Sequence, residues 1–132
     1  MFLDASAVVA VLAGEPDFEI YVEKLEAAVT KLISPLAKYE AVLAIARLCR
    51  PPSLEAASSS LDRFLALYDV RIIDITAEVG NEAVGAFAQF GKGRHEARLN
   101  MGDCFAYACA KLHGVPLLCK GNDFHLTGIE IA

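Results

Sequence analysis

The sequence predicts an α/β protein in which helices cover both faces of a mostly parallel sheet. Short apolar runs typical of buried strands alternate with longer runs of helical periodicity along the 132 residues. Strands separated by helices are joined by right-handed crossovers, which make neighbouring strands parallel. A chain of this length is long enough to bury a substantial core, so we expect residues 1–132 to form a single domain.

The first half of the chain supplies two predicted strands and three helices. Residues 2–4 form the first strand, and the helix that follows stops near Gly14. Residues 17–28 have an amphipathic helical pattern. The stretch "VTKLISP" (29–35) predicts the second strand, and "LAKYEAVLAIARLC" (36–49) predicts a helix that is apolar almost all round and therefore largely buried.

The second half repeats the alternation. Ser53 follows two prolines and is expected to cap a helix, and Thr76 is expected to start another. The stretch "GKGRHEARLN" (91–100), with two glycines, predicts the one long loop. The remaining predicted elements are strands at "VRIIDI" and "VPLLC", a helix over 101–113, a turn at "KGND" and a short final strand in "GIEIA".

Composition and charge exclude several classes of protein. Hydrophobic residues make up 55% of the chain, yet no run approaches the roughly 18 to 20 apolar residues that a membrane span needs. The first residues lack a basic region and carry Asp4, so we expect a cytoplasmic protein with no membrane partner. The net charge of −5 gives no overall attraction to nucleic acid, so a polyanionic substrate would need metal ions or a local basic patch.

The four cysteines are predicted to be buried thiols. They show neither C-x-x-C spacing nor a Cys/His ligand pattern, which argues against zinc and against a disulfide framework.

Four isolated carboxylates interrupt apolar segments and form the candidate site. Asp4 and Asp123 follow predicted strands, where open α/β sheets bind ligands, and Glu40 and Asp103 lie in apolar helices. A buried carboxylate must be paired or must coordinate a metal. Oxygen ligands favour Mg²⁺ or Mn²⁺, and such a site would hydrolyse a phosphodiester.

Each carboxylate also has a structural alternative. Asp4 can cap the first helix, and Asp103 fits the third position of a helix capped by Asn100. Asp123 can be a turn residue, and Glu40 can lie on a narrow polar stripe of its helix that faces outward.

Other polar residues are candidates for supporting roles. Ser6 can hydrogen-bond a carboxylate or a metal-bound water, or can satisfy the start of the helix. Lys92, Arg94 and Arg98 in the predicted loop can contact phosphates of RNA, or can be an ordinary solvated loop.

Four motifs together resemble the PIN-domain ribonucleases, and specifically the VapC-type toxins of toxin–antitoxin pairs. They are "FLDASAVVAVL", "YEAVLAIARL", "LNMGDCFAYACAK" and "PLLCKGNDFHLTGIEI", which occur in the family's order and span most of the chain.

This resemblance implies a three-layer α/β/α sandwich around a five-stranded parallel sheet. It implies an endoribonuclease that uses one or two Mg²⁺ or Mn²⁺ ions bound by the residues matching Asp4, Glu40, Asp103 and Asp123. The implied partners are an RNA substrate such as a tRNA or another structured RNA, a cognate antitoxin that blocks the site, and a second copy in a homodimer.

The chain departs from the family pattern at two positions. Many relatives have an Asp or another polar residue where this chain has Asn122, which we expect to support the site. Gly128 stands where many have a fifth acid, and this leaves the number of metal ions open between one and two.

Two other classes of function remain as alternatives. A phosphoryl-transfer or receiver-type protein would use an Asp after an early strand, with Lys120 near the phosphate, but it leaves Glu40 and Asp103 unexplained. A binding module without catalysis would use none of the carboxylates for chemistry.

Overall fold

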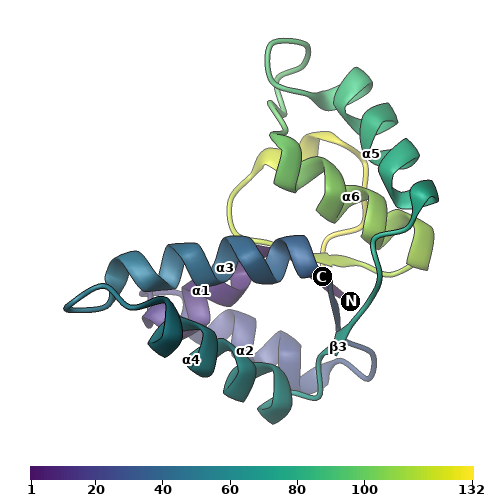
Figure 1. The fold of residues 1–132 in the computed structure, drawn as a ribbon. Coiled ribbons are helices and arrows are strands. Elements are labelled where there is room, and N and C mark those ends of the chain that lie inside the picture. The colour runs from purple at the N-terminus through teal and green to yellow at the C-terminus, as the bar shows by residue number, and fades with distance from the viewer.

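The computed structural model describes residues 1–132 and contains one parallel sheet between helices (Figure 1). The strands are β1 (Phe2–Leu3), β2 (Leu32–Ile33), β3 (Arg71–Ile72) and β4 (Leu117–Leu118), in the order β3-β2-β1-β4. The helices are α1 (Ala5–Ala13), α2 (Phe18–Ala27), α3 (Pro35–Leu48), α4 (Leu54–Leu67), α5 (Ala77–Phe90), α6 (Met101–His113) and the 3₁₀ turn η1 (Asp123–Leu126).

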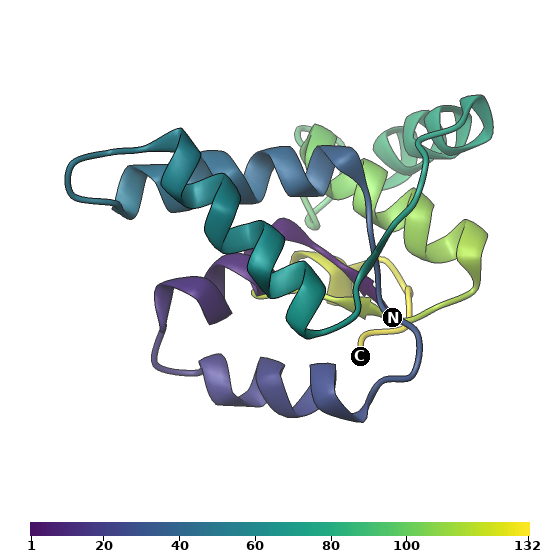
Figure 2. The same ribbon diagram turned by 60° about the horizontal axis from the view of Figure 1, so that its bottom comes forward.

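The layers follow the predicted arrangement. Figure 2 shows α2 on one side of the strands and α3 and α6 on the other. Helix α6 packs on the neighbouring strands β1 and β4, and α3 packs against both α1 and α6. The predicted α/β/α sandwich with a parallel sheet is therefore confirmed.

The expected count of five strands is wrong, because the sheet has four. The segment "GIEIA" pairs with β4 only through an isolated parallel bridge between Leu117 and Ile131. Leu117 N donates to Glu130 O at 2.8 Å, and Ala132 N donates to Leu117 O at 2.9 Å. The chain turns at Gly128, whose φ is +74°, so only its last residues reach the edge of β4.

Side-chain caps define the helix starts that the sequence predicts. Ser53 and Thr76 cap α4 and α5 by accepting hydrogen bonds from backbone N–H groups three residues later. Gly14 and Gly114 end α1 and α6 in the left-handed conformation that glycine adopts without strain. The local sequence therefore sets the starts of α4 and α5 and the ends of α1 and α6.

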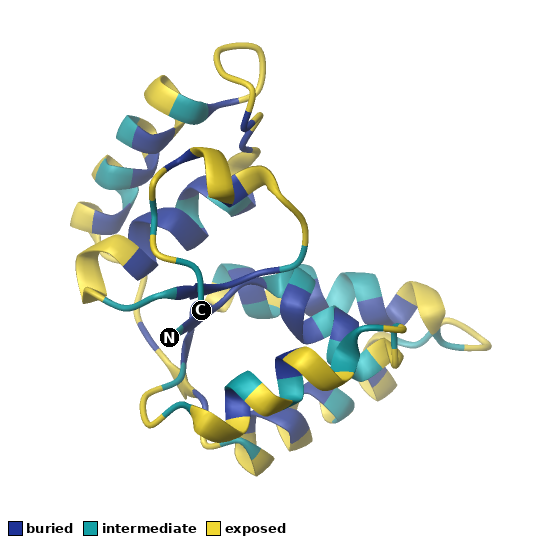
Figure 3. Ribbon diagram, turned by 180° about the vertical axis from the view of Figure 1, so that it is seen from behind, coloured by how far each residue is buried: buried dark blue, intermediate teal, exposed yellow.

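The core lies between the strands and the inner faces of the helices, as the burial colours in Figure 3 show. Residues of β1, β2 and β4 are buried, and three of the four cysteines are buried while Cys49 is partly exposed. The expectation that α3 is largely buried holds for one face only, since Tyr39 and Leu48 are 59% and 55% exposed. No helix is both long enough and apolar enough to cross a bilayer.

The sheet brings the carboxyl ends of β1 and β4 together. Asp4 N donates to Leu118 O at 2.9 Å, which places the residue after β1 beside the residues after β4. Helix α6 packs on both strands and α3 packs against α6, so side chains from four elements can meet there.

Candidate active site

Asp4 is a helix cap and a buried carboxylate at the same time. It precedes α1, and its Oδ2 accepts hydrogen bonds from Ser6 N at 2.9 Å and from Ser6 Oγ. Ser6 Oγ in turn accepts from Lys120 N at 2.9 Å, which links the residue after β4 to Asp4. Burial raises the pKa of Asp4, and the hydrogen bonds from Ser6 oppose that shift.

Asp103 likewise combines a capping role with a place in the site. Asn100 N donates to Asp103 Oδ2 at 2.8 Å, and Asp103 N donates to Asn100 Oδ1 at 3.1 Å, so the two form a capping box at the start of α6. Burial raises the pKa of Asp103, and the nearby negative charges of Asp4 and Asp123 raise it further. The structural alternative is thus correct for this residue, but it does not account for the acidic neighbours.

Glu40 reaches the same place from α3. It is partly buried and lines a pocket with Asp4 and Asp103, so it does not lie on an outward-facing stripe. Burial raises its pKa, and the charges of the two aspartates add to the effect. Three of the four predicted carboxylates therefore share one pocket.

The pocket carries no cation that neutralises these carboxylates. Asp4, Glu40 and Asp103 form no salt bridge. The one cationic side chain in the wall, Lys120, binds Asp17 at 2.8 Å and also binds Glu15. The remaining lining residues are Ala5, Ser6, Val9, Ala44 and Asn100.

Asp123 and Asn122 lie at the edge of this site. Both are exposed in and beside η1, and neither lines the pocket. The charge of Asp123 nevertheless raises the pKa of Asp103, so the two carboxylates are near each other. Asn122 makes no side-chain capping hydrogen bond, which leaves its amide free to face solvent.

The donor set suits a hard divalent cation. No three Asp, Glu, His or Cys side chains converge closely enough to form a finished coordination shell. Asp4, which is buried, and the partly buried Glu40 and Asp103 nevertheless repel one another and lack a cationic partner. An added cation would offset this repulsion. Burial raises the pKa of Cys119 to about 12, so this neighbouring thiol stays protonated and the available ligands are oxygens.

The predicted basic residues lie outside the carboxylate pocket. Lys92, Arg94 and Arg98 are exposed and line a separate shallow hollow in the loop that joins α5 to α6. Arg94 lies over the ring of Phe87, 5.6 Å from its centroid, which fixes part of the loop. The loop leads directly into the Asn100 cap, so its charges flank the pocket from the α6 side.

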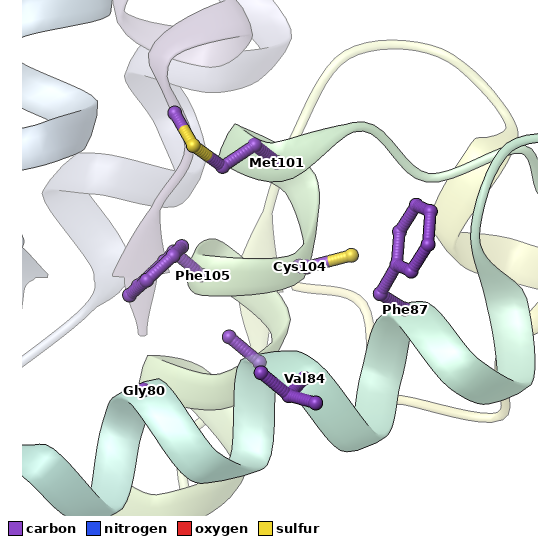
Figure 4. Close-up of a pocket in the computed structure, with 7 residues that line it drawn as sticks. Gly80, Val84, Phe87, Met101, Cys104 and Phe105 are labelled. Carbon is purple, nitrogen blue, oxygen red and sulfur yellow. The ribbon is translucent and has the colours of Figure 1, made fainter.

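A second hollow is apolar and lies between α5 and α6 (Figure 4). Val84 and Phe87 from α5 face Met101 and Phe105 from α6. Val84 is 71% exposed and Met101 is 64% exposed. Met101, two residues before Asp103, is part of this hollow, and no charged residue lines it.

Two features of the pocket escaped the sequence reasoning. The ion pairs of Lys120 with Glu15 and Asp17 join residues more than 100 positions apart, so no local pattern indicates them. Gly102 lies against the carboxylate of Glu40, and its only sequence signal is a glycine near the start of an otherwise regular helix.

Comparison with known proteins gives consistent results. The family model described as "PIN domain" matches residues 1–130. Ribonuclease VapC30 of Mycobacterium tuberculosis is 42% identical over 130 residues, which cover 98% of this chain and 95% of the relative.

Solved structures share the fold at lower identity. Mycobacterium tuberculosis VapC20, described as a toxin that cleaves the sarcin–ricin loop, superposes with a TM-score of 0.78 at 19% identity and covers 99% of this chain and 97% of its own. A chain of a toxin–antitoxin complex from Klebsiella pneumoniae gives a TM-score of 0.68 at 18% identity, with 93% and 88% covered.

The raised pKa of Glu40 predicts a stability gain on removing its charge. In the folded metal-free protein this carboxyl keeps its proton to a higher pH than in the unfolded chain, so ionising it destabilises the fold as the pH rises above about 4. Glu40→Gln and the unchanged protein should therefore melt at similar temperatures at about pH 4, and the variant should melt a few degrees higher at about pH 7. Thermal unfolding in EDTA measures the difference.

The matched control is Glu23→Gln, which removes an exposed glutamate on α2. If Glu23→Gln raised the melting temperature by the same amount, the effect would come from the change in net charge and not from the pocket. A Glu40→Gln variant that melts lower than the unchanged protein at neutral pH would contradict the assignment.

Proposed function

This chain belongs to the PIN-domain family and its VapC ribonucleases, and we propose that it cleaves RNA with a divalent cation held by Asp4, Glu40 and Asp103. The observation that carries the proposal is the pocket in which these three carboxylates meet without a cationic partner. The two earlier alternatives, a phosphoryl-transfer or receiver-type protein and a binding module without catalysis, fall away with the family assignment.

The residues of the pocket have distinct tasks in this account. A divalent cation held by these residues would stabilise the charge that develops on the phosphoryl oxygens and would make the attacking water easier to deprotonate. Asp4 and Asp103 are held in fixed orientations by Ser6 and Asn100, so both present carboxylate oxygens without reorganisation. Glu40 comes from α3 and is the third carboxylate that lines the pocket.

Mg²⁺ or Mn²⁺ is the proposed ion, because the donors are carboxylate oxygens and the neighbouring thiols are protonated. Asp123 and Asn122 at the edge of the pocket would complete one site or hold part of a second. We therefore propose one ion among the three pocket carboxylates, with a second ion dependent on Asp123.

RNA is proposed to approach over the loop between α5 and α6. The pocket itself is acidic and repels phosphates, whereas Lys92, Arg94 and Arg98 present three positive charges on the exposed loop that leads into α6. A structured RNA, including a tRNA, would be recognised by its shape and its phosphates rather than by the pocket.

The protein acts as the toxin of a toxin–antitoxin pair, in which a cognate antitoxin blocks the pocket. We also propose a homodimer and place its contact at the apolar hollow between α5 and α6. Val84 and Met101 are largely exposed in this hollow, and a two-fold contact there would bury these apolar side chains in both copies.

Loss of one pocket carboxylate should abolish cleavage. Asp103→Asn keeps a group that can accept the hydrogen bond from Asn100 N, so α6 keeps its cap while the site loses a charge. We expect cleavage of a partly unstructured RNA in Mn²⁺ to fall by more than about 100-fold, since even outer-shell changes at metal sites typically cost 10- to 100-fold. EDTA should give the same loss in the unchanged protein.

The control for this experiment is Asp62→Asn, which removes an exposed carboxylate on α4 that pairs with Lys38. Cleavage by Asp103→Asn at the rate of the control would show that Asp103 only caps its helix.

Neutralising the loop should weaken RNA binding without changing the chemical step. Lys92→Ala removes an exposed charge that makes no salt bridge, and we expect the slope of log Kd against log salt to fall by about one. Binding of RNA to a cleavage-deficient Asp103→Asn background, measured by fluorescence anisotropy at several salt concentrations, gives this slope. Arg63→Ala on α4 is the control. Equal slopes for the two variants would show that the loop between α5 and α6 does not contact RNA.

A charge in the apolar hollow should separate the copies. Val84 is the most exposed aliphatic residue of the hollow, so Val84→Glu should fold normally and elute as a monomer in size-exclusion chromatography with light scattering. The control is Val29→Glu, at a position 95% exposed in the segment that joins α2 to β2. A Val84→Glu protein that stays dimeric would contradict the placement of the interface.

A further inference from the structure

Gly102 occupies a position in α6 that its backbone conformation does not explain. It is the second residue of the helix, it is buried, and it is not among the residues with positive φ. Glycine is among the poorest helix formers, so a side chain would normally be favoured at such a position. The reason for glycine must therefore lie in what surrounds it.

The carboxylate of Glu40 fills the space that a side chain at position 102 would need. A Cβ built on Gly102 would stand 2.6 Å from Cδ of Glu40 and would overlap both carboxylate oxygens. These three atoms, all from the Glu40 carboxyl group, are its nearest neighbours. A charged group from α3 thus lies directly against the backbone of α6.

The other helical glycines behave differently. Gly80 and Gly85 in α5 have no atom within 4 Å of an added Cβ, so each could carry a methyl group at no steric cost. An added Cβ at Gly91, just after α5, would overlap the ring and backbone of Phe87, a residue of the preceding helix rather than of the pocket. Gly102 alone among them stands against a carboxylate of the pocket.

We propose that Gly102 is a positioning residue that sets how closely Glu40 approaches Asp103. Its missing side chain lets Glu40 lie beside the first turn of α6, one residue before Asp103, so that carboxylates from two helices face one pocket. A methyl group there would push the Glu40 carboxylate away from α6. That this placement lets Glu40 and Asp103 bind the same cation rests on the function proposed above.

A double-mutant cycle tests the steric part without any metal. The Glu40 carboxylate ends a flexible side chain and can turn aside, so in EDTA Gly102→Ala should raise the melting temperature of the full chain by less than the helix preference of alanine alone would give, or should lower it. In a Glu40→Ala background, where the space is empty, the same change should raise the melting temperature by the full helix preference. An equal change in both backgrounds would overturn the proposal.

Metal binding tests what the placement achieves. Mn²⁺ titrated calorimetrically into folded Gly102→Ala should bind at least about tenfold more weakly than into the unchanged protein. Gly85→Ala is the matched control, with unchanged Mn²⁺ affinity and a slightly higher melting temperature. A folded Gly102→Ala protein with unchanged Mn²⁺ affinity would show that Gly102 does not position a ligand.

The two proposals fail in different ways. If the unchanged protein itself binds no Mn²⁺ and cleaves no RNA, the proposed function is wrong, and the cycle in EDTA still decides whether Gly102 and Glu40 compete for space. If the unchanged protein binds Mn²⁺ but the cycle shows no coupling, the proposed function stands and the role of Gly102 is wrong.

Discussion

Mutual repulsion among one buried and two partly buried carboxylates is the constraint on which the rest of this structure depends. Asp4, Glu40 and Asp103 face one pocket, burial disfavours the charged form of each, and no basic side chain relieves them. The one lysine in the wall is already bound by two other acids. This arrangement lowers the stability of the metal-free protein, and under the proposed function a divalent cation bound among the three carboxylates would restore that stability.

The α/β architecture makes such a cluster reachable with few residues. Parallel strands β1 and β4 end side by side, and the hydrogen bond from Lys120 N to Ser6 Oγ ties the two strand ends together around Asp4. Helix α6 packs on these strands and α3 packs against α6, so Asp103 and Glu40 line the same pocket as Asp4. Local hydrogen bonds that cap the helices also orient the aspartates, so one set of contacts serves both the fold and the site.

The sequence predicted the parts of this picture that are local. Caps at Ser53, Thr76 and Asn100 set helix starts through hydrogen bonds to residues three positions away, and the isolated acids stood out against apolar neighbours. The prediction of a fifth strand was wrong because the chain turns at Gly128 and then forms only one bridge to β4. Whether such a segment forms a strand or a single bridge depends on backbone conformation, which the hydrophobic pattern does not indicate. The approach of Glu40 to Gly102 was equally beyond reach, since it joins residues of two helices 62 positions apart whose packing no periodicity records.

The most direct test of the account is a crystal structure of the protein grown with Mn²⁺, with an anomalous difference map collected to locate the ion. The account predicts a peak in the pocket at ligand distance from carboxylate oxygens of Asp4 and Asp103, with Glu40 turned toward it. A map with no peak in the pocket at saturating Mn²⁺, or with its peaks only elsewhere on the molecule, would contradict the claim that these buried carboxylates exist to hold a cation.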